Sequence, residues 1–588
     1  MTTDGILLYC LTNELNHTLK NGRIDKIHGL DKGQILIKVR SAQSSHQLLL
    51  SIHPVDGGLY ISHQDFHAPS QPSLFTMVLR KHLSGAKIIN IETFQMDRIL
   101  FIHFATRNDI GDLSRKTIIL EVMGKHSNMI LVDESFIIID AMKKYNHLIS
   151  RHREVLPNLP YVFPPSSSKH NLLEYTMQNL IPDLVAQTAI NGDWTIEKLL
   201  SAMFQGLSIH TSKTLLQYCA IPSLTLPEFS KMELTVLENC LASFKKTLQN
   251  PPFCAYIQYQ EDIPHQVSLF PMDNTQICSG FSEALDAVYT TKNLLQSIQH
   301  EKQILRKNVS LRIKKLEKKL KIHQQNICLA KETDMERIKG ELLTANLYQI
   351  RNGMKEIVVD NYYDPDFGKI TIPLDPSLSP SANVSRYFKR VSKIREAAKI
   401  SREMLYTLEK EIAYLDSVLL SVDEADSPIE LLEIRDEILG DSTYQVHKKN
   451  KKSANPISLP LHFVSSTGLD IYVGKNNKQN DALTKSAEGH DLWLHTKQIP
   501  GSHVILKTNQ GNYDDQSLLE AALLAAAHSK GRDSSKVPVD YTFKKNLRKP
   551  NKAKAGMVTY ESNQTILVDP SKQALAKIMN TTKKATDK

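Results

Sequence analysis

Two long stretches of helical periodicity, within residues 290–440, constrain the fold of this chain more than any other feature. In both stretches the apolar residues recur at spacings of three and four, which is typical of a helix that buries one seam against a partner helix. Between them, residues 346–385 contain Asn352-Gly353, Asp364-Pro365 and Pro373, which are incompatible with a continuous helix. We therefore expect an antiparallel coiled-coil hairpin over 286–440 with a small β-rich tip. The seam residues are Leu305, Val309, Ile313, Leu316, Leu320, His323, Ile327 and Ala330, then Val391, Ile394, Ala398, Ser401, Leu405, Leu408, Ile412, Leu415 and Leu419.

The charges along these two helices favour the antiparallel pairing. Residues 302–321 hold nine Lys or Arg and one acidic residue, whereas residues 409–428 hold six acidic residues and one Lys. A hairpin that pairs residue 344 with residue 386 places these segments opposite each other, and opposite charges across a seam stabilise its register. A basic stripe is left over, either for an external partner or as a solvated surface.

The first half of the chain divides into a β-rich part, residues 1–168, and a mainly helical part, residues 169–285. Helices are expected over 5–19 and 73–84, and Gly, Asn and Asp separate the apolar runs, as is typical of strands. Phe204–Ser208 is either a helix-hairpin-helix turn, which would direct N–H groups at phosphate, or a simple connector. The strand-like runs are Ile35–Ile37, Leu48–Leu50, Ile99–Ile102, Ile118–Leu120 and Ile137–Ile139.

The net charge of +9 lies almost wholly in the last 148 residues, which hold 23 basic and 13 acidic side chains. A basic linker over 441–455 precedes a mixed α/β domain over 456–580, followed by a tail, 581–588. Strands are expected at Leu461–Val464, Leu469–Val473 and Met557–Tyr560, and a helix at Leu518–His528. The charge predicts either a polyanion partner or a soluble basic surface.

Several classes of protein are disfavoured. The six cysteines are scattered with no C-x-x-C pair, so neither a zinc site nor a disulfide framework is expected. The first residues lack a basic n-region, and no run of about 18 apolar residues occurs, so we expect a cytoplasmic chain with no membrane segment. Phosphate-binding glycine loops and the common hydrolase motifs do not occur. We therefore expect no enzyme, no cofactor and no metal site.

Two polar segments of the β-rich part are candidates for ligand contact. Asp97-Arg98 precedes an apolar strand, and adjacent residues on a strand point to opposite faces, so the pair is poorly placed to bond to itself. Either one side chain is structural and the other contacts a ligand, or each side chain pairs with another residue of the chain. The segment from Glu121 to Asn128, with Gly124 and Lys125, is either a plain hairpin turn or a place to hold an RNA end.

A third polar segment lies in the C-terminal domain. Trp493 and two histidines beside a Gly-Ser turn suit stacking on unpaired bases and phosphate contact, or else form a core. Two histidines eight residues apart are a weak metal signal. Six Lys or Arg between residues 544 and 554 form a candidate RNA-backbone patch. The candidate residues are Asn476, Asn477, Asp491, Trp493, His495, Gly501, Ser502, His503, Lys544, Lys545, Arg548 and Lys549.

Together these motifs resemble the NFACT family, and within it the bacterial RqcH branch, also known as fibronectin-binding protein A. The resemblance covers essentially the whole chain and is most specific in the C-terminal part. The matching segments are Asp4-Gly5, Gly22–Ile24, Leu79–Leu83, Gln95–Arg98, Glu121–Lys125 with Asn128, Val473–Asn477, Gln479–Asp481, Asp491–His495, Pro500–His503 and Pro538–Thr542.

This resemblance implies an α+β multidomain fold. The family has a glycosylase-like NFACT-N domain, a helix-hairpin-helix segment, a coiled-coil middle domain and an NFACT-R RNA-binding domain. The NFACT-N fold in turn resembles formamidopyrimidine-DNA glycosylases, whose nucleophile is an N-terminal proline. This chain begins Met1-Thr2-Thr3-Asp4 and has no such proline, so glycosylase chemistry is not expected.

The resemblance also implies a function in ribosome-associated quality control. Family members bind large ribosomal subunits obstructed by peptidyl-tRNA and recruit alanyl-tRNA. With a small RNA-binding partner, RqcP, they promote template-free alanine addition that marks the chain for degradation. We expect a monomer on the ribosome, with tRNA bound by Asp4, Asp97, Arg98, Glu121, Gly124, Lys125 and Asn128. A fibronectin-binding surface adhesin and a DNA-repair lyase are the alternatives.

Overall fold

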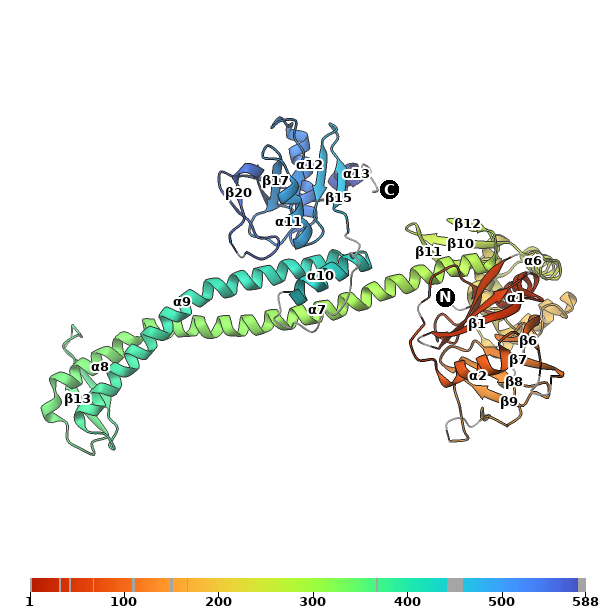
Figure 1. Cartoon of the computed structure of the whole chain (residues 1–588), viewed down its shortest axis with the longest axis horizontal. Coiled ribbons are helices and arrows are strands. Elements are labelled where there is room, and N and C mark those ends of the chain that lie inside the picture. The colour runs from red at the N-terminus through yellow and green to blue at the C-terminus, as the bar shows by residue number, and fades with distance from the viewer. Residues whose placement is uncertain are drawn as a thin grey trace. The chain divides into compact units, whose positions relative to one another are not determined.

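The structure, a computed structural model, describes residues 3–30, 33–41, 44–66, 68–107, 111–148, 152–165, 168–365, 368–440, 458–551 and 553–579. It divides into two compact units, Met1–Leu295 and Gln296–Lys588, whose elements are labelled in Figure 1. The expected basic linker, Lys552 of the basic patch and the expected tail lie outside the described residues. No helix of the described ranges is long and apolar enough to cross a membrane.

The first unit is built on one antiparallel sheet, whose described strands have the order β4-β3-β2-β1-β5-β6-β7-β8-β9. Helices α1 (Gly5–Leu19) and α2 (Leu74–Leu83) pack on it, close to the helices predicted over 5–19 and 73–84. The predicted strand-like runs all fall in or beside strands. The strands are β1 (Arg23–Leu30), β2 (Gln34–Arg40), β3 (Ser45–Ser51), β4 (Gly58–Ile61), β5 (Lys87–Thr93), β6 (Ile99–Arg107), β7 (Leu113–Glu121), β8 (Asn128–Val132) and β9 (Ile138–Ala141).

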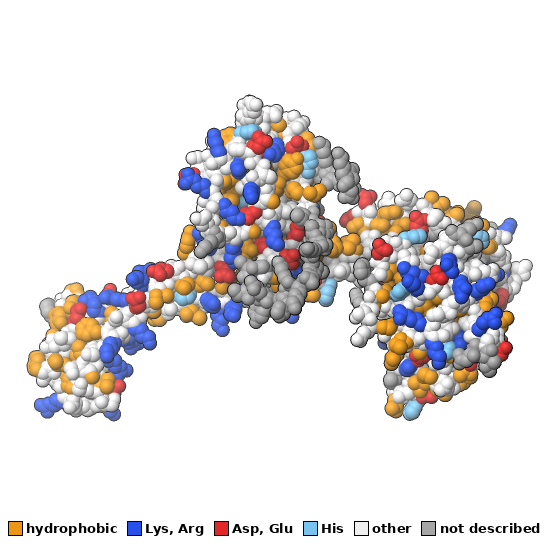
Figure 2. Space-filling view, in the orientation of Figure 1, with side chains coloured by type: hydrophobic (Ala, Val, Ile, Leu, Met, Phe, Trp, Pro, Cys, Tyr) orange, Lys and Arg blue, Asp and Glu red, His pale blue; other side chains and the backbone are white. Residues whose placement is uncertain are grey.

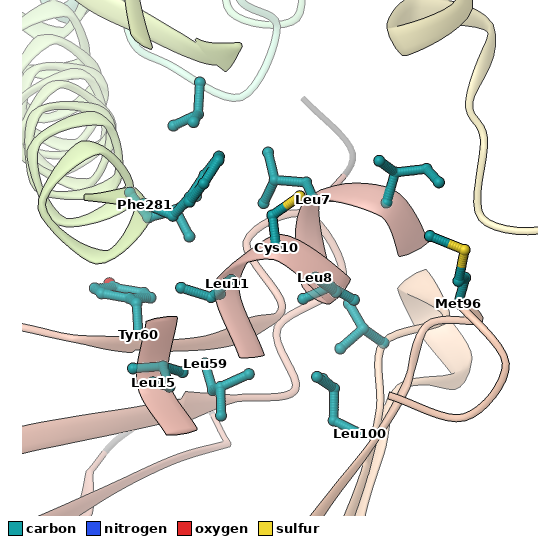
Figure 3. Packing of buried hydrophobic residues seen from close by; sticks show 14 of the residues in the cluster. Leu7, Leu8, Cys10, Leu11, Leu15, Leu59, Tyr60, Met96, Leu100 and Phe281 are labelled. Atoms are coloured by element: carbon teal, nitrogen blue, oxygen red, sulfur yellow. The ribbon is translucent and has the colours of Figure 1, made fainter. Parts of the chain in front are cut away.

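The core of this unit lies between α1 and the sheet. Leu8, Leu11 and Leu15 of α1 are buried on the side of the helix that faces the strands, near Leu59 and Leu100, as Figure 3 shows. Burying each such side chain stabilises the fold by about 1.5–3 kcal/mol relative to exposure. The packed α1 therefore fixes the position of the loop that precedes it.

The helical segment of the first unit contains α3 (Leu180–Asn191), α4 (Ile196–Met203), α5 (Ile209–Tyr218) and α6 (Lys231–Gln249). The structure corrects the sequence analysis twice here. A three-stranded sheet, β11-β10-β12, follows α6 where helix was expected, with β10 at Ala255–Gln260, β11 at Ile263–Ser268 and β12 at Thr275–Cys278. Cys219 and Cys240 form a disulfide, because the packing of α5 and α6 brings their Cα atoms to 6.3 Å.

Helices α7 (Phe281–Lys331) and α9 (Pro380–Glu424) pack along a shared apolar cluster in the second unit. Arg306 forms an ion pair with Asp423 at 2.6 Å, and Arg390 forms one with Glu336 at 3.4 Å. The segment that begins with α7 and the segment formed by α9 therefore run antiparallel to each other. His323 and Ser401, polar members of the two predicted seams, hydrogen-bond at 3.0 Å.

A small domain lies between the two long helices. It consists of α8 (Thr333–Ala345), the hairpin β13 (Glu356–Asp360) and β14 (Lys369–Pro373), and the start of α9. Leu342, Ile357 and Ile372 belong to its own apolar cluster. After α9 the chain forms α10 (Pro428–Gly440).

The C-terminal domain is built on an antiparallel sheet with the order β15-β16-β18-β17-β19-β22, covered by the Ala-rich helix α12 (Asp515–Ala527). Its first two strands and α12 lie within a few residues of the predicted positions. The strands are β15 (Leu461–Val464), β16 (Asp470–Val473), β17 (Leu492–Thr496), β18 (Val504–Leu506), β19 (Val537–Phe543) and β22 (Gln564–Val568), with a side hairpin of β20 (Leu547–Arg548) and β21 (Thr559–Tyr560) and helices α11 (Asn477–Ser486) and α13 (Lys572–Met579).

Candidate functional site: two nucleic-acid interfaces

Asp97 and Arg98 lie in the tight turn between β5 and β6, directly before the strand that the sequence analysis had them enter. Gln95 and Met96 have φ of 48° and 60°, in the left-handed region that L residues rarely adopt. The Asp97 amide donates to the Phe94 carbonyl at 2.7 Å, and the Arg98 amide donates to the Asp97 carboxylate at 2.7 Å. The carboxylate therefore closes the turn, while the Arg98 side chain is exposed.

The turn is held by close backbone approach from two other segments. A Cβ atom on Gly5 would lie 1.8 Å from the Met96 carbonyl oxygen, and one on Gly206 would lie 2.1 Å from it. The Gly206 carbonyl also accepts from the Ile6 amide at 3.1 Å. Glycine is required at both positions because any side chain there would push the Asp97 turn away.

Asp4 links two of these segments, the start of α1 and the start of α5, and is itself buried. One of its carboxylate oxygens caps α1 by accepting from the Leu7 amide at 3.0 Å. The other accepts from the Ser208 amide at 3.2 Å and from the Thr211 hydroxyl at 2.5 Å, at the start of α5. Both oxygens thus have protein partners, so Asp4 positions the site from within.

These segments surround a cavity of about 920 Å³. Arg98, Lys169 and Lys213 bring positive charge to its wall, together with His210. Gln205 donates to Asp97 at 3.3 Å. Burial, and then the neighbouring Arg98, lower the pKa of Lys169. The lining residues are Thr3, Asp4, Gly5, Asp97, Arg98, Met123, Pro164, Pro165, Lys169, Ser201, Gln205, Gly206, Leu207, Ser208, Ile209, His210 and Lys213.

Glu121, a predicted ligand residue, lies at the end of β7 and is fully buried. Its carboxylate accepts two hydrogen bonds from Arg153, at 2.7 and 2.5 Å, and one from the Tyr161 hydroxyl at 2.8 Å. Arg153 also donates to the Val162 carbonyl at 2.8 Å. The next amide, Val122, donates to the Arg98 carbonyl at 2.8 Å. Glu121 therefore orders the segment that leads to Pro164 and the backbone of the Arg98 turn.

The other predicted residues of this hairpin divide into internal and exposed groups. Asn128 is buried and bonds to the backbone of Lys143 with both its amide atoms, at 2.9 Å each. Gly124 has φ of +60° at the start of the short 3-10 helix Gly124–His126. Lys125 is exposed. Of the predicted tRNA-binding set, Arg98 and Lys125 present their side chains to solvent, while Asp4, Glu121 and Asn128 act as internal supports.

The aromatic candidates of the C-terminal domain form a core. Trp493 is 1% exposed and packs against Ile505, Leu547 and Tyr560. The rings of His495 and His503 lie 5.5 Å apart, and His503 bonds to the Thr484 hydroxyl at 2.8 Å. Burial lowers the pKa of both histidines, that of His503 to about 3. Both rings are therefore neutral at pH 7, and the described residues contain no cluster of three or more potential metal ligands.

The remaining candidates of this segment also have internal partners. Asp491 is buried and accepts from the Lys507 ammonium at 2.6 Å. Gly501 has no room for a side chain, because a Cβ atom would lie 2.6 Å from the Thr496 hydroxyl. The Ser502 amide donates to the His528 carbonyl at 3.0 Å. Asn476 and Asn477 are buried at the start of α11, where they contact α10.

The predicted basic patch forms an open groove of about 300 Å³. Lys544, Arg548 and Lys549 line it, with Lys485 on the opposite side and Asp481 paired with Lys549. Lys545 is exposed beside it, with its ammonium 5.4 Å from the ring centre of Phe543. Figure 2 shows Lys and Arg side chains on the face of this domain that is in view. The groove has the charge and exposure that an RNA backbone requires.

The sequence analysis missed several residues of both sites. Lys169, His210 and Lys213 line the N-terminal cavity from segments far from Asp97 in the sequence, and Lys485 joins the basic groove from α11. The turn that the sequence did single out, Phe204–Ser208, also lines the cavity through Gln205 to Ser208. Arg153 and Tyr161 were missed as partners of Glu121. The Pro-rich stretch next to Tyr161 was the only local signal, and it indicated a boundary.

Comparison with known proteins agrees with this arrangement. The model of the NFACT N-terminal and middle domains matches residues 4–456, and the model of the NFACT protein RNA binding domain matches residues 460–562. The fold and these matches define a multidomain protein with a long helical middle part and an RNA-binding domain. The chain belongs to the NFACT family.

Relatives match over very different lengths. The chain is 35% identical over 595 residues to the Rqc2 homolog RqcH of Bacillus subtilis, covering 98% of this chain and 100% of that protein. It is 24% identical over 362 residues to the human ribosome quality control complex subunit NEMF, covering 57% of this chain and 32% of that protein. The N-terminal structure of the fibronectin/fibrinogen-binding protein from Streptococcus suis is 31% identical, with a TM-score of 0.41, and covers 49% of this chain and 99% of that one.

Proposed function

We propose that this chain is a ribosome-associated quality control factor. It binds large ribosomal subunits obstructed by peptidyl-tRNA, recruits alanyl-tRNA and, with the small RNA-binding partner RqcP, promotes template-free alanine tailing of the stalled chain. The full-length match to an Rqc2 homolog, which spans both RNA-facing sites, is the observation that carries the proposal.

The division of labour follows from the two sites. Arg98, Lys125 and the cationic cavity wall hold the tRNA, while the basic groove around Arg548 grips ribosomal RNA. The chain supplies binding and geometry and acts as a monomer in the cytoplasm. Peptide-bond formation belongs to the ribosome, so the chain itself needs no catalytic residue.

Finer features of the fold belong to the same proposal. The N-terminal domain is glycosylase-like, and the paired helices α7 and α9 form a hairpin that reaches across the subunit. The domains are 1–168, 169–285, 286–440 and 456–580. The family's name for fibronectin binding gives the alternative, a surface adhesin, which none of the contacts described above favours.

Alanine tailing is the most specific outcome to test. In cells that express a reporter without a stop codon, we expect reporter chains with added C-terminal alanines only when this protein is present. Mass spectrometry of the reporter measures the tails, and a sucrose gradient locates the protein. Untailed reporter together with protein absent from large-subunit fractions would contradict the proposal, and protein recovered mainly outside the cells would favour the adhesin.

A further inference from the structure

Helix α10 presents a row of buried or half-buried carboxylates to the C-terminal domain. We call Glu430, Glu433 and Glu437 the acidic stripe. Their spacing of three and four residues places them on one face of the helix, about 5–6 Å apart. Glu430 is 5% exposed and Glu437 is 7% exposed, so both carboxylates have left water for protein partners.

Three consecutive residues of the C-terminal domain bind the three carboxylates in order. The Lys475 ammonium donates to Glu430 at 2.7 Å, the Asn476 amide to Glu433 at 2.7 Å, and the Asn477 amide to Glu437 at 3.0 Å. Lys478 donates to the backbone carbonyl of Glu433 at 3.3 Å. We call Lys475–Lys478 the donor face. It includes both asparagines that the sequence analysis assigned to RNA.

The contact between the helices and this domain is polar. Beyond the stripe, His528 faces Glu424 at 3.6 Å and Lys530 faces Asp416 at 3.8 Å, so these ion pairs again have the acid on the helix and the base on the domain. Among the described residues, the apolar cluster of the domain and that of α7, α9 and α10 share no member. Hydrogen bonds and ion pairs therefore make up much of this contact, beside a pocket that Tyr414 of α9 and Ile499 and Met557 of the domain line together.

An RNA backbone offers the same chemistry as the acidic stripe. Both present a row of anionic oxygens, and ammonium and amide donors bind phosphate oxygens as readily as carboxylates. A polar contact of this kind exchanges one set of acceptors for another without exposing an apolar core.

We propose that the acidic stripe is an internal mimic of an RNA backbone, which covers the donor face until RNA takes its place. This inference rests on the proposed RNA binding of the C-terminal domain and adds how that binding is controlled. It reconciles the burial of Asn476 and Asn477 with a role in RNA contact, because they meet RNA only after the C-terminal domain has separated from α10, which stays packed on α7 and α9 through Leu431 and Ile434.

The test compares two full-length variants with the same change in charge. In the stripe variant, Glu430→Gln, Glu433→Gln and Glu437→Gln keep the side-chain shape and remove three charges. In the control, Glu403→Gln, Glu409→Gln and Asp436→Asn remove three charges from exposed positions of α9 and α10. The probe is a fluorescein-labelled RNA hairpin of about 20 nucleotides, and anisotropy reports its affinity at low salt.

We expect the stripe variant to bind the hairpin about tenfold more tightly than the wild type, because two or three charge-assisted hydrogen bonds no longer compete. The affinity of the control variant for the hairpin should increase clearly less. In the wild type, RNA should also quicken hydrogen exchange in α10, which shows the separation directly. Equal affinities of the two variants, or an α10 that stays protected while RNA is bound, would overturn the inference.

The same experiment separates this inference from the proposed function. If the stripe variant binds no more tightly but the protein still sediments with large subunits, the mimic is wrong and the function stands. A poly-glutamate peptide that competes with the hairpin at equal charge concentration would assign the donor face to an acidic protein instead of RNA, which also overturns the inference.

Discussion

Replacing Asp97 and Arg98 together by alanine should reduce the recovery of tRNA with the purified protein by about 10- to 100-fold. This range corresponds to about 1.5–3 kcal/mol for hydrogen bonds to a charged group. Arg98 is exposed at the cavity rim and supplies the charge, whereas Asp97 closes the turn that aims it. Sequencing and quantifying the co-purified tRNA measures the effect.

The chain offers a matched control for this substitution. Asp25 and Arg40 form an exposed ion pair at 3.7 Å in the same domain, and such pairs contribute about 0–1 kcal/mol. Replacing both by alanine alters the charge equally and should leave tRNA recovery unchanged. Wild-type recovery in the Asp97→Ala/Arg98→Ala protein would show that the cavity rim does not bind tRNA.

Replacing Glu121 by glutamine should destabilise the N-terminal sheet by about 3–5 kcal/mol, because the fully buried carboxylate is removed and the largely covered Arg153 guanidinium loses its counter-charge. In the full chain, the slowest amides of β7 and β8 should then exchange at least about 100-fold faster without any tRNA present. A direct tRNA-contacting residue would change binding and leave this exchange rate unaltered.

Two further variants sharpen the interpretation of Glu121. Glu134→Gln alters an exposed carboxylate of the same domain and should leave exchange unchanged. Glu121→Gln combined with Arg153→Gln should lower the free energy of unfolding little more than Glu121→Gln alone, because the two side chains form one ion pair. Fully additive effects of the two substitutions would refute this coupling.

The sequence predicted most of the architecture where periodicity is long or caps are local. The helix expected over 5–19 is present as α1, and the seam residues His323 and Ser401 do meet across α7 and α9. The sheet β10–β12 was missed because its strands are short and follow a long helix. The Cys219–Cys240 disulfide depends on helix packing, which no spacing rule in the sequence encodes.

The sequence named residues of the candidate sites but did not predict which contacts those residues make. The sequence singled out Asp97 and Arg98 as a polar pair, but the turn that holds them depends on Gly5 and Gly206 from distant segments. The sequence analysis predicted that polar residues such as Glu121, Asn128 and Asp491 contact a ligand. In the structure each of them hydrogen-bonds to other residues of the chain. Sequence patterns identify hydrogen-bonding capacity, but only the fold decides which partner satisfies it.

The RNA that co-purifies with the wild-type protein tests the central claim most directly. We expect large-subunit ribosomal RNA together with one dominant tRNA family, the one that carries alanine, when the protein is isolated from cells and its RNA is sequenced. Recovery of ribosomal RNA with an unselected tRNA mixture would contradict selective recruitment. Recovery of neither RNA would contradict the assignment to ribosome quality control.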